Sequence, residues 1–214
     1  MQLLSINIGQ ERSIQNGKRT EATGIYKLPV ATPVQVTQLG LAGDAVVDVE
    51  NHGGVDQAVY VYGEPDYAWW SMQLGSELAP GAFGENLTIG GLESADLNIG
   101  DILNVGAVVL QVTAARIPCA TLAARMGDPG FVKRFRAAER PGAYCRVLQA
   151  GAVQAGDPVA LAQYAGETIT LVAMFRDFYD PQPSAETIRR HLAAPIAVRA
   201  RADIEEKARK TGKV

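Results

Sequence analysis

The chain has 214 residues, of which 47% are hydrophobic and 20% charged, a composition that excludes a disordered or fibrous protein. Its 20 Lys and Arg against 23 Asp and Glu give a net charge of −3, so it has no general attraction to nucleic acid or to an acidic membrane surface. No apolar run approaches the roughly 20 residues that span a bilayer, and residues 1–4 lack the basic start of a signal peptide, so we expect a cytoplasmic protein.

As far as about residue 163, the sequence predicts short strands separated by Gly, Pro and Asp. Residues 34–39 alternate apolar and polar side chains, as a half-buried strand does. Further strands are expected at 45–49, 58–62, 144–148 and 158–161, with a hairpin over 102–114 whose second arm is 108–112. The Gly-Asp pairs that begin at Gly43, Gly100, Gly127 and Gly156 are expected to form turns.

Helices are expected at a few places among these strands. Tyr67, Trp70 and Leu74 form one apolar stripe on a helix spanning 65–74, and Phe131 and Phe135 indicate a short helix. Many short strands with few inserted helices predict a mainly β fold, a closed or nearly closed β-barrel.

The sequence changes character after Tyr164. Residues 169–178 are apolar, Ser184 is a candidate N-cap, and residues 196–210 are typical of a solvated amphipathic helix. We therefore expect two parts, a barrel domain over 1–163 and a small three-helix subdomain over 164–214 that packs on the barrel or on a partner.

Cys119 is the strongest candidate for chemistry. It follows an apolar strand and precedes an expected helix, three residues after Arg116. The positive end of a helix and a guanidinium both lower the pKa of a thiol and favour the thiolate, which is the nucleophilic and metal-binding form. A buried structural cysteine is the alternative at this position. Cys145 lies within an apolar strand, where core packing is the better interpretation.

Two loops supply further candidates. His52 precedes Gly53 and Gly54, whose backbone N–H groups can approach an anion closely. Asn86 lies in a second Gly-containing loop; an exposed turn is the alternative for both. His191 is expected on the surface of the C-terminal helices.

Several common catalytic motifs are absent from the sequence. It contains no Walker loop, GxGxxG, GxSxG or HExxH pattern. Two cysteines without a CxxC pair exclude a zinc finger and an iron–sulfur cluster within the chain, and two histidines make a His-based zinc site implausible.

Five segments occur together in a recognisable order: residues 23–27, 40–44, 52–60, 83–87 and 116–119. In this order they resemble the MOSC domain, the family named after the C-terminal domain of molybdenum cofactor sulfurase, and specifically its bacterial branch associated with resistance to 6-N-hydroxylaminopurine. The resemblance covers most of residues 1–163, and the helical tail is similar to the three-helix domain of that branch.

The resemblance implies a β-barrel that binds the molybdenum cofactor, with Cys119 as the metal ligand and catalytic residue. A soft thiolate suits molybdenum. The cofactor phosphate would be held by Lys27 and Arg116 with the Gly53-Gly54 turn, and His52 and Asn86 would contact the pterin or lie behind it. Pyridoxal phosphate binding is a further implication at the level of the family.

The implied activity is detoxification by two-electron reduction of N-hydroxylated small molecules, in which N–OH and two protons give N–H and water. His52 or Glu85 would donate a proton, and electrons would come from a separate reductase. Monomer and homodimer both remain open. The alternative is a non-enzymatic protein that carries the cofactor, or sulfur as a Cys119 persulfide.

Overall fold

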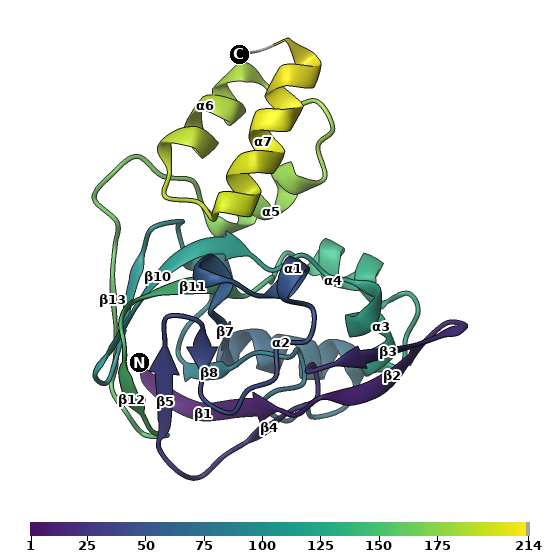
Figure 1. Cartoon of the computed structure of the whole chain (residues 1–214), viewed down its shortest axis with the longest axis vertical. Coiled ribbons are helices and arrows are strands. Elements are labelled where there is room, and N and C mark those ends of the chain that lie inside the picture. The colour runs from purple at the N-terminus through teal and green to yellow at the C-terminus, as the bar shows by residue number, and fades with distance from the viewer. Residues whose placement is uncertain (213–214) are drawn as a thin grey trace.

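The computed structural model describes residues 1–212 and consists of a β structure with several helices against it and the three C-terminal helices above one end (Figure 1). Its strands are β1 (Gln2–Gly9), β2 (Arg12–Asn16), β3 (Arg19–Thr23), β4 (Lys27–Pro29), β5 (Val34–Thr37), β6 (Gly40–Leu41), β7 (Val59–Gly63), β8 (Leu87–Gly90), β9 (Ile102–Val105), β10 (Val108–Ala115), β11 (Ala143–Gln149), β12 (Gly151–Val153) and β13 (Val159–Ala162). Its helices are α1 (Val49–His52), α2 (Glu64–Leu74), α3 (Ala120–Met126), α4 (Phe131–Ala138), α5 (Leu171–Phe178), α6 (Ala185–Ala193) and α7 (Val198–Thr211), with short 3₁₀ turns η1 (Val55–Gln57) and η2 (Ser94–Asp96).

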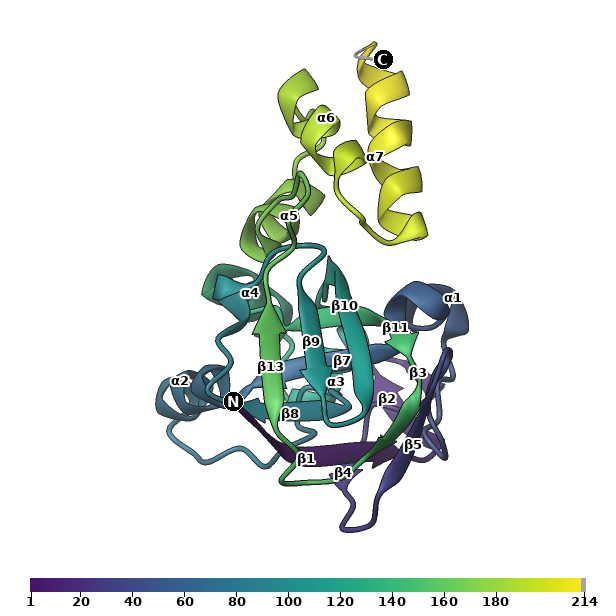
Figure 2. The same cartoon turned by 90° about the vertical axis from the view of Figure 1, so that its left-hand side faces the viewer.

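Eight strands form one sheet in the order β13-β9-β10-β11-β7-β8-β1-β4. Its neighbours are antiparallel except β7 and β8, which run parallel and are connected through α2. A bridge between Gln2 and Pro158, with backbone hydrogen bonds from Leu3 to Asp157 and from Val159 to Met1, joins β1 to the start of β13. These contacts curl the sheet around a single apolar interior (Figure 2), and the predicted mainly β fold with inserted helices is confirmed.

Aromatic side chains fill the space between the sheet and the helices beside it. Trp70 of α2 packs against Phe131 and Phe135 of α4 with ring centroids 5.0 and 5.9 Å apart, and Phe83 completes the cluster. Tyr67 and Trp70 are buried as the helical stripe predicted. The cluster fixes α2 and α4 against the sheet, and α3, which carries the candidate cysteine at its start, lies immediately before α4.

One predicted strand is wrong. Residues 45–49 were expected to be extended, but residues 45–48 form a loop and Val49 begins α1. The Asp48 side chain accepts a hydrogen bond from the Asn51 backbone N–H at 3.1 Å, so it caps a short helix where apolar alternation alone indicates a strand. This helix matters for the candidate site, because its last residue is His52.

The tail contains the three expected helices. The Ser184 hydroxyl accepts a hydrogen bond from the Thr187 N–H at 3.0 Å, as an N-cap does. Strand β13 ends at Ala162 and α5 begins at Leu171, while Figures 1 and 2 both place α5, α6 and α7 above the same end of the barrel. The division into domains at residue 163 stays a prediction.

Candidate functional site

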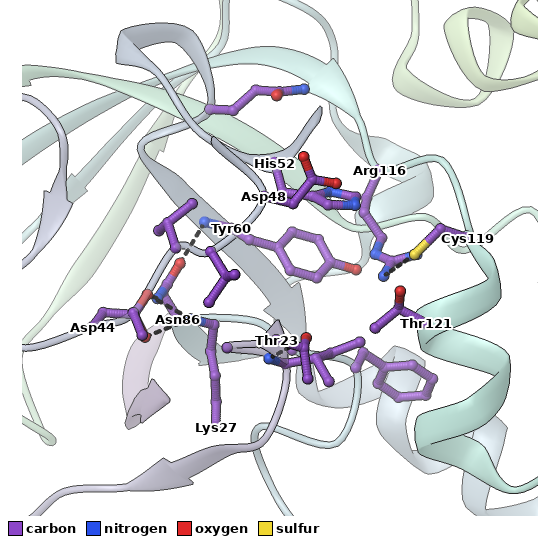
Figure 3. Close-up of a pocket in the computed structure, with 18 of the residues that line it drawn as sticks. Thr23, Lys27, Asp44, Asp48, His52, Tyr60, Asn86, Arg116, Cys119 and Thr121 are labelled. Carbon is purple, nitrogen blue, oxygen red and sulfur yellow. Dashed lines mark hydrogen bonds and ion pairs between the residues drawn. The ribbon is translucent and has the colours of Figure 1, made fainter. Parts of the chain in front are cut away.

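A cavity of about 150 Å³ opens at one end of the barrel, and we call it the barrel cavity (Figure 3). It brings together most of the predicted site residues from distant parts of the chain: its walls include Lys27, His52, Asn86, Arg116 and Cys119. These residues come from β4, α1, the loop before β8 and the connection between β10 and α3. The structure thus assembles in one place what the sequence places in four separate segments.

Cys119 stands at the point where β10 turns into α3. It is the N-cap residue of α3, with extended backbone angles, and it is partly exposed. Burial raises the pKa of this thiol, but a hydrogen bond from the His52 side chain and the positive charge of Arg116 outweigh burial and lower the pKa to about 6. Cys119 is therefore mainly a thiolate at neutral pH, in the form that binds soft metals or attacks electrophiles.

Arg116 is a buried cation without a carboxylate partner among residues 1–212. Its side chain is 3% exposed, and one guanidinium nitrogen lies 3.9 Å from Cys119 Sγ while another donates to the Ile117 carbonyl at 3.2 Å. The rings of Tyr60 and Phe135 flank it, with centroids 5.9 and 5.8 Å away. A buried charge is costly unless it is paired, so the thiolate and any anion in the cavity are its natural partners.

His52 connects Cys119 to Tyr144. The His52 Nδ1 atom lies 3.1 Å from the Tyr144 hydroxyl. Burial raises the pKa of Tyr144, so the phenol keeps its proton. A tautomer with its proton on Nε2 lets Nδ1 accept from the Tyr144 hydroxyl, while the same side chain lowers the pKa of the Cys119 thiol. His52 is thus in a position to hold a proton beside the thiolate.

Lys27 lies on the other side of the cavity in a closed polar group (Figure 3). Its Nζ atom lies 2.5 Å from both carboxylate oxygens of Asp44, and the two side chains are almost completely buried. Asn86 donates to Asp44 Oδ2 at 2.8 Å, and its own oxygen accepts from the Tyr60 N–H at 3.1 Å. Lys27 is thus neutralised by Asp44, which leaves Arg116 as the cation best placed to attract an anion.

Three other candidates do not line the barrel cavity. Gly53 and Gly54 form the turn after α1, where the Gly53 N–H already donates to the Val49 carbonyl at 3.2 Å. Glu85 is fully buried beneath the cavity and accepts from Tyr67 at 2.6 Å and from the Gly81 N–H at 2.7 Å. Burial raises the pKa of Glu85, and the geometry gives it no route to a ligand.

The structure confirms the sequence interpretation of the remaining cysteine and contradicts that of the remaining histidine. Cys145 is completely buried in β11, and burial raises its pKa well above the usual thiol value, which confirms a core role. His191, expected on the surface, is only 5% exposed because its Nε2 atom pairs with Asp177 Oδ2 at 2.8 Å between α5 and α6. Sequence reasoning gave no role to Asp44, Tyr60 or Tyr144. Asp44 and Tyr60 lie in the segments 40–44 and 52–60 that carry the family resemblance, and Asp44 also in an expected turn, but no motif pointed to Tyr144.

No group of three or more His, Cys, Asp or Glu within residues 1–212 could hold a metal ion by itself. A metal at Cys119 would therefore need most of its ligands from a cofactor. None of the helices in the described part of the chain is long and apolar enough to cross a membrane.

The fold and the site together define a class: a β-barrel protein with an activated cysteine and a buried arginine at the barrel mouth. A family model described as the MOSC domain matches residues 48–160, and the chain belongs to this family. The family is associated with the molybdenum cofactor.

Individual similarities extend beyond that segment. The chain is 34% identical over 192 residues to an uncharacterized protein, YflK, from Bacillus subtilis, covering 89% of this chain and 86% of that protein. It is 32% identical over 166 residues to a protein named reductase from Gibberella moniliformis, covering 75% of this chain but 29% of that longer protein. The crystal structure of YiiM from Geobacillus stearothermophilus superposes with a TM-score of 0.80 at 28% identity, covering 96% of this chain and 98% of that one. Within the family the similarities thus indicate the YiiM-like branch.

Proposed function

We propose that this chain is an oxidoreductase that binds the molybdenum cofactor and reduces N-hydroxylated small molecules, with Cys119 as the protein ligand of molybdenum. The observation that carries the proposal is the pairing of a partly exposed thiol of pKa about 6 with a buried Arg116 that has no carboxylate partner among the described residues. The family supports the cofactor, and the Gibberella relative named reductase supports the reaction class.

The residues present fit the cofactor. A thiolate is a suitable ligand for molybdenum, and a desolvated guanidinium suits the anionic phosphate and dithiolene groups of a molybdopterin. When bound, the cofactor would supply the two-electron chemistry that converts N–OH to N–H and water. Asn86 and the Lys27–Asp44 pair present neutral hydrogen-bonding groups on the opposite wall, so they would orient a pterin rather than add charge.

This chain's own contribution to the reaction is the control of protons and water. His52, hydrogen-bonded to Cys119 and close to Tyr144, is placed to deliver a proton to a leaving hydroxyl. Glu85, the other candidate, does not line the cavity. We expect electrons to come from a separate reductase, since these 214 residues contain only two cysteines, too few for a four-cysteine cluster.

The test is purification from a cofactor-producing host, followed by metal analysis and by turnover of 6-N-hydroxylaminopurine with a supplied electron donor. Wild type and Cys145→Ala should retain molybdenum and activity, whereas Cys119→Ala should lose most of both. Equal molybdenum in Cys119→Ala and wild type would refute Cys119 as the ligand.

The same experiment separates the proposed enzyme from a carrier. Cys119 is reachable from solvent, so it could also pass on the cofactor, or sulfur as a persulfide. A carrier would release its cargo once, in a stoichiometric amount, to an acceptor protein and show no repeated turnover.

A further inference from the structure

Tyr144 stands at the border between two cavities. A second cavity, of about 450 Å³, lies between the end of β10 and the tail helices, and Tyr144, His52 and Cys119 line both it and the barrel cavity. Tyr144 is nonetheless only 7% exposed. A largely buried side chain thus reaches the candidate site at the point where the two cavities adjoin.

The sheet fixes the position of the Tyr144 ring. Tyr144 lies in β11, opposite Ala114 of β10 and Tyr60 of β7. Its backbone carbonyl accepts a hydrogen bond from the Thr113 hydroxyl at 3.0 Å, and its ring packs against the Tyr60 ring with centroids 5.1 Å apart. Because β10, β11 and β7 are neighbours in the middle of the sheet, the place of the Tyr144 hydroxyl is set by the central part of the fold.

His52 has much less support from its own element. It is the last residue of α1, a helix of four residues, none of which is buried. A helix this short is not stable by itself, since most helical stability in proteins comes from packing. The imidazole therefore needs a partner whose position is fixed elsewhere, and its Nδ1 atom lies 3.1 Å from the Tyr144 hydroxyl.

The direction of this hydrogen bond follows from the phenol. Burial raises the pKa of Tyr144, so the hydroxyl keeps its proton, and within residues 1–212 it forms no other hydrogen bond. The hydroxyl therefore donates to Nδ1 of a neutral imidazole, which leaves the one N–H of the ring on Nε2. A phenol can also accept, so the contact survives when the ring takes up a proton. His191 differs, because its partner is the carboxylate of Asp177, which only accepts.

We propose that Tyr144 is a positioning residue for His52: its hydroxyl holds Nδ1, so that Nε2 is the nitrogen presented to a bound ligand. The inference rests on the proposed function, in which His52 delivers a proton to a leaving hydroxyl, and adds the residue that directs this donor. Tyr144 acts only through His52. Without the phenol hydroxyl the imidazole is free to rotate about its side-chain bonds, and its N–H points away from the ligand for part of the time.

The test is Tyr144→Phe, which removes the hydroxyl and keeps the ring. Tyr62→Phe is the matched control, because Tyr62 is a buried tyrosine of β7 whose hydroxyl donates to the Arg140 carbonyl at 2.8 Å and which lines neither cavity. In the cofactor-loaded protein Tyr144→Phe should lower kcat for 6-N-hydroxylaminopurine about tenfold and change KM less than about twofold, since a misdirected donor affects the transition state. Tyr62→Phe should change neither, and molybdenum content should be equal in all three proteins.

Nitrogen-15 NMR of the protein without cofactor gives a readout that does not depend on turnover. The chain has only two histidines, and His52→Asn identifies the signals of His52. At a pH where the imidazole is neutral, the wild-type Nδ1 resonance should be that of an unprotonated nitrogen that accepts a hydrogen bond. In Tyr144→Phe it should move to the position of a free acceptor nitrogen, and in Tyr62→Phe it should stay in place. A wild-type Nδ1 that carries the proton, or an Nδ1 resonance unchanged in Tyr144→Phe, would overturn the proposal.

A double mutant keeps the proposal testable if Tyr144→Phe lowers the melting temperature. The kcat of Tyr144→Phe combined with His52→Asn should equal that of His52→Asn alone, and additive losses would overturn a role through His52. Wild-type turnover that Tyr144→Phe leaves unchanged would overturn the positioning role and leave the proposed function standing. The expected NMR shift in a protein without turnover would support the contact between Tyr144 and His52 and overturn the proposed function.

Discussion

The β10–α3 connection and strand β11 each hold one of the two cysteines, and β10 and β11 are neighbours in the sheet. Val112 of β10 pairs directly with Cys145 of β11, and Cys119 follows β10 by four residues. Yet the pKa of Cys119 falls to about 6 whereas burial raises that of Cys145 far above the usual value. Two thiols in neighbouring parts of the structure, one in β11 and one just after β10, therefore have opposite chemistry.

Burial alone does not explain the difference. Burial raises the pKa of both thiols, and it is the largest single influence on each. Cys119 differs because His52 of α1 and Arg116 of the same β10–α3 connection lie beside it, and both favour the thiolate. The comparison shows that an activated cysteine depends on the groups gathered around it, and each prediction below removes or measures one of them.

Alkylation should show the largest difference. At pH 7 Cys119 is mostly thiolate and partly exposed, so in the native protein iodoacetamide should modify it about 10³-fold faster than Cys145. Mass spectrometry of the wild type, Cys119→Ser and Cys145→Ser assigns the sites. In urea, which unfolds the protein, the alkylation rates of Cys119 and Cys145 should become similar. Similar native rates would mean that the two environments do not differ as the structure indicates.

Stability should depend on pH through Cys119. Its folded pKa lies below its unfolded value near 8.5, so its contribution is complete above that value and is lost as pH falls through about 6. Between pH 8 and pH 5 the free energy of unfolding should therefore fall by about 2 kcal/mol more in the wild type than in Cys119→Ser. Urea titrations with a reductant present, carried out at each pH, measure the free energy of unfolding of both proteins. Parallel pH profiles would contradict a lowered folded pKa.

Removal of the Arg116 guanidinium should raise the pKa of the Cys119 thiol directly. In Arg116→Gln the pKa of Cys119 should rise part of the way to the ordinary thiol value, because the larger favourable influence, the hydrogen bond from His52, remains; the thiolate fraction at pH 7 should fall about two- to threefold. In Arg116→Lys, which keeps the positive charge, the pKa of Cys119 should lie between its values in the wild type and in Arg116→Gln. Thiolate absorbance followed against pH gives the three values. An unchanged titration in Arg116→Gln would show that Arg116 does not act on Cys119.

The sequence predicts most of the fold because each element has a local cause. Alternation, turn glycines and helical stripes all act over a few residues, and Gly43, Gly100, Gly127 and Gly156 do adopt the positive φ of turn glycines. The exceptions are the eight-residue strand β1 and several short elements. Strands β1 to β4 were not predicted individually, and α1 replaced an expected strand because one Asp48 cap outweighed a short apolar run.

The site was predictable only in part, for a different reason. The position of Cys119 before a helix is local, and so is its spacing from Arg116. The neutralisation of Lys27 by Asp44, the contact of His52 with Tyr144 and the burial of His191 against Asp177 join residues at least 14 positions apart. No periodicity encodes such contacts, so a sequence can suggest which side chains matter but not which charges remain unpaired.

The smallest expected effect tests whether the tail supports the site through α1. Arg199 of α7 donates to the Val49 and Gly53 carbonyls at the two ends of α1, both at 3.4 Å, and α1 carries His52. Arg199→Ala should loosen His52 and lower the thiolate fraction of Cys119 about two- to threefold at pH 6. The exposed Arg209 of the same helix provides the control variant Arg209→Ala.

A double-mutant cycle decides whether His52 transmits this effect. If Arg199 acts only by positioning the imidazole, Arg199→Ala should not change the Cys119 pKa further once His52→Asn has removed the hydrogen bond. If its charge acts on the sulfur directly, the two shifts should add. The first result is expected, because His52 and Arg116 are leading influences on the pKa of the Cys119 thiol and Arg199 is not.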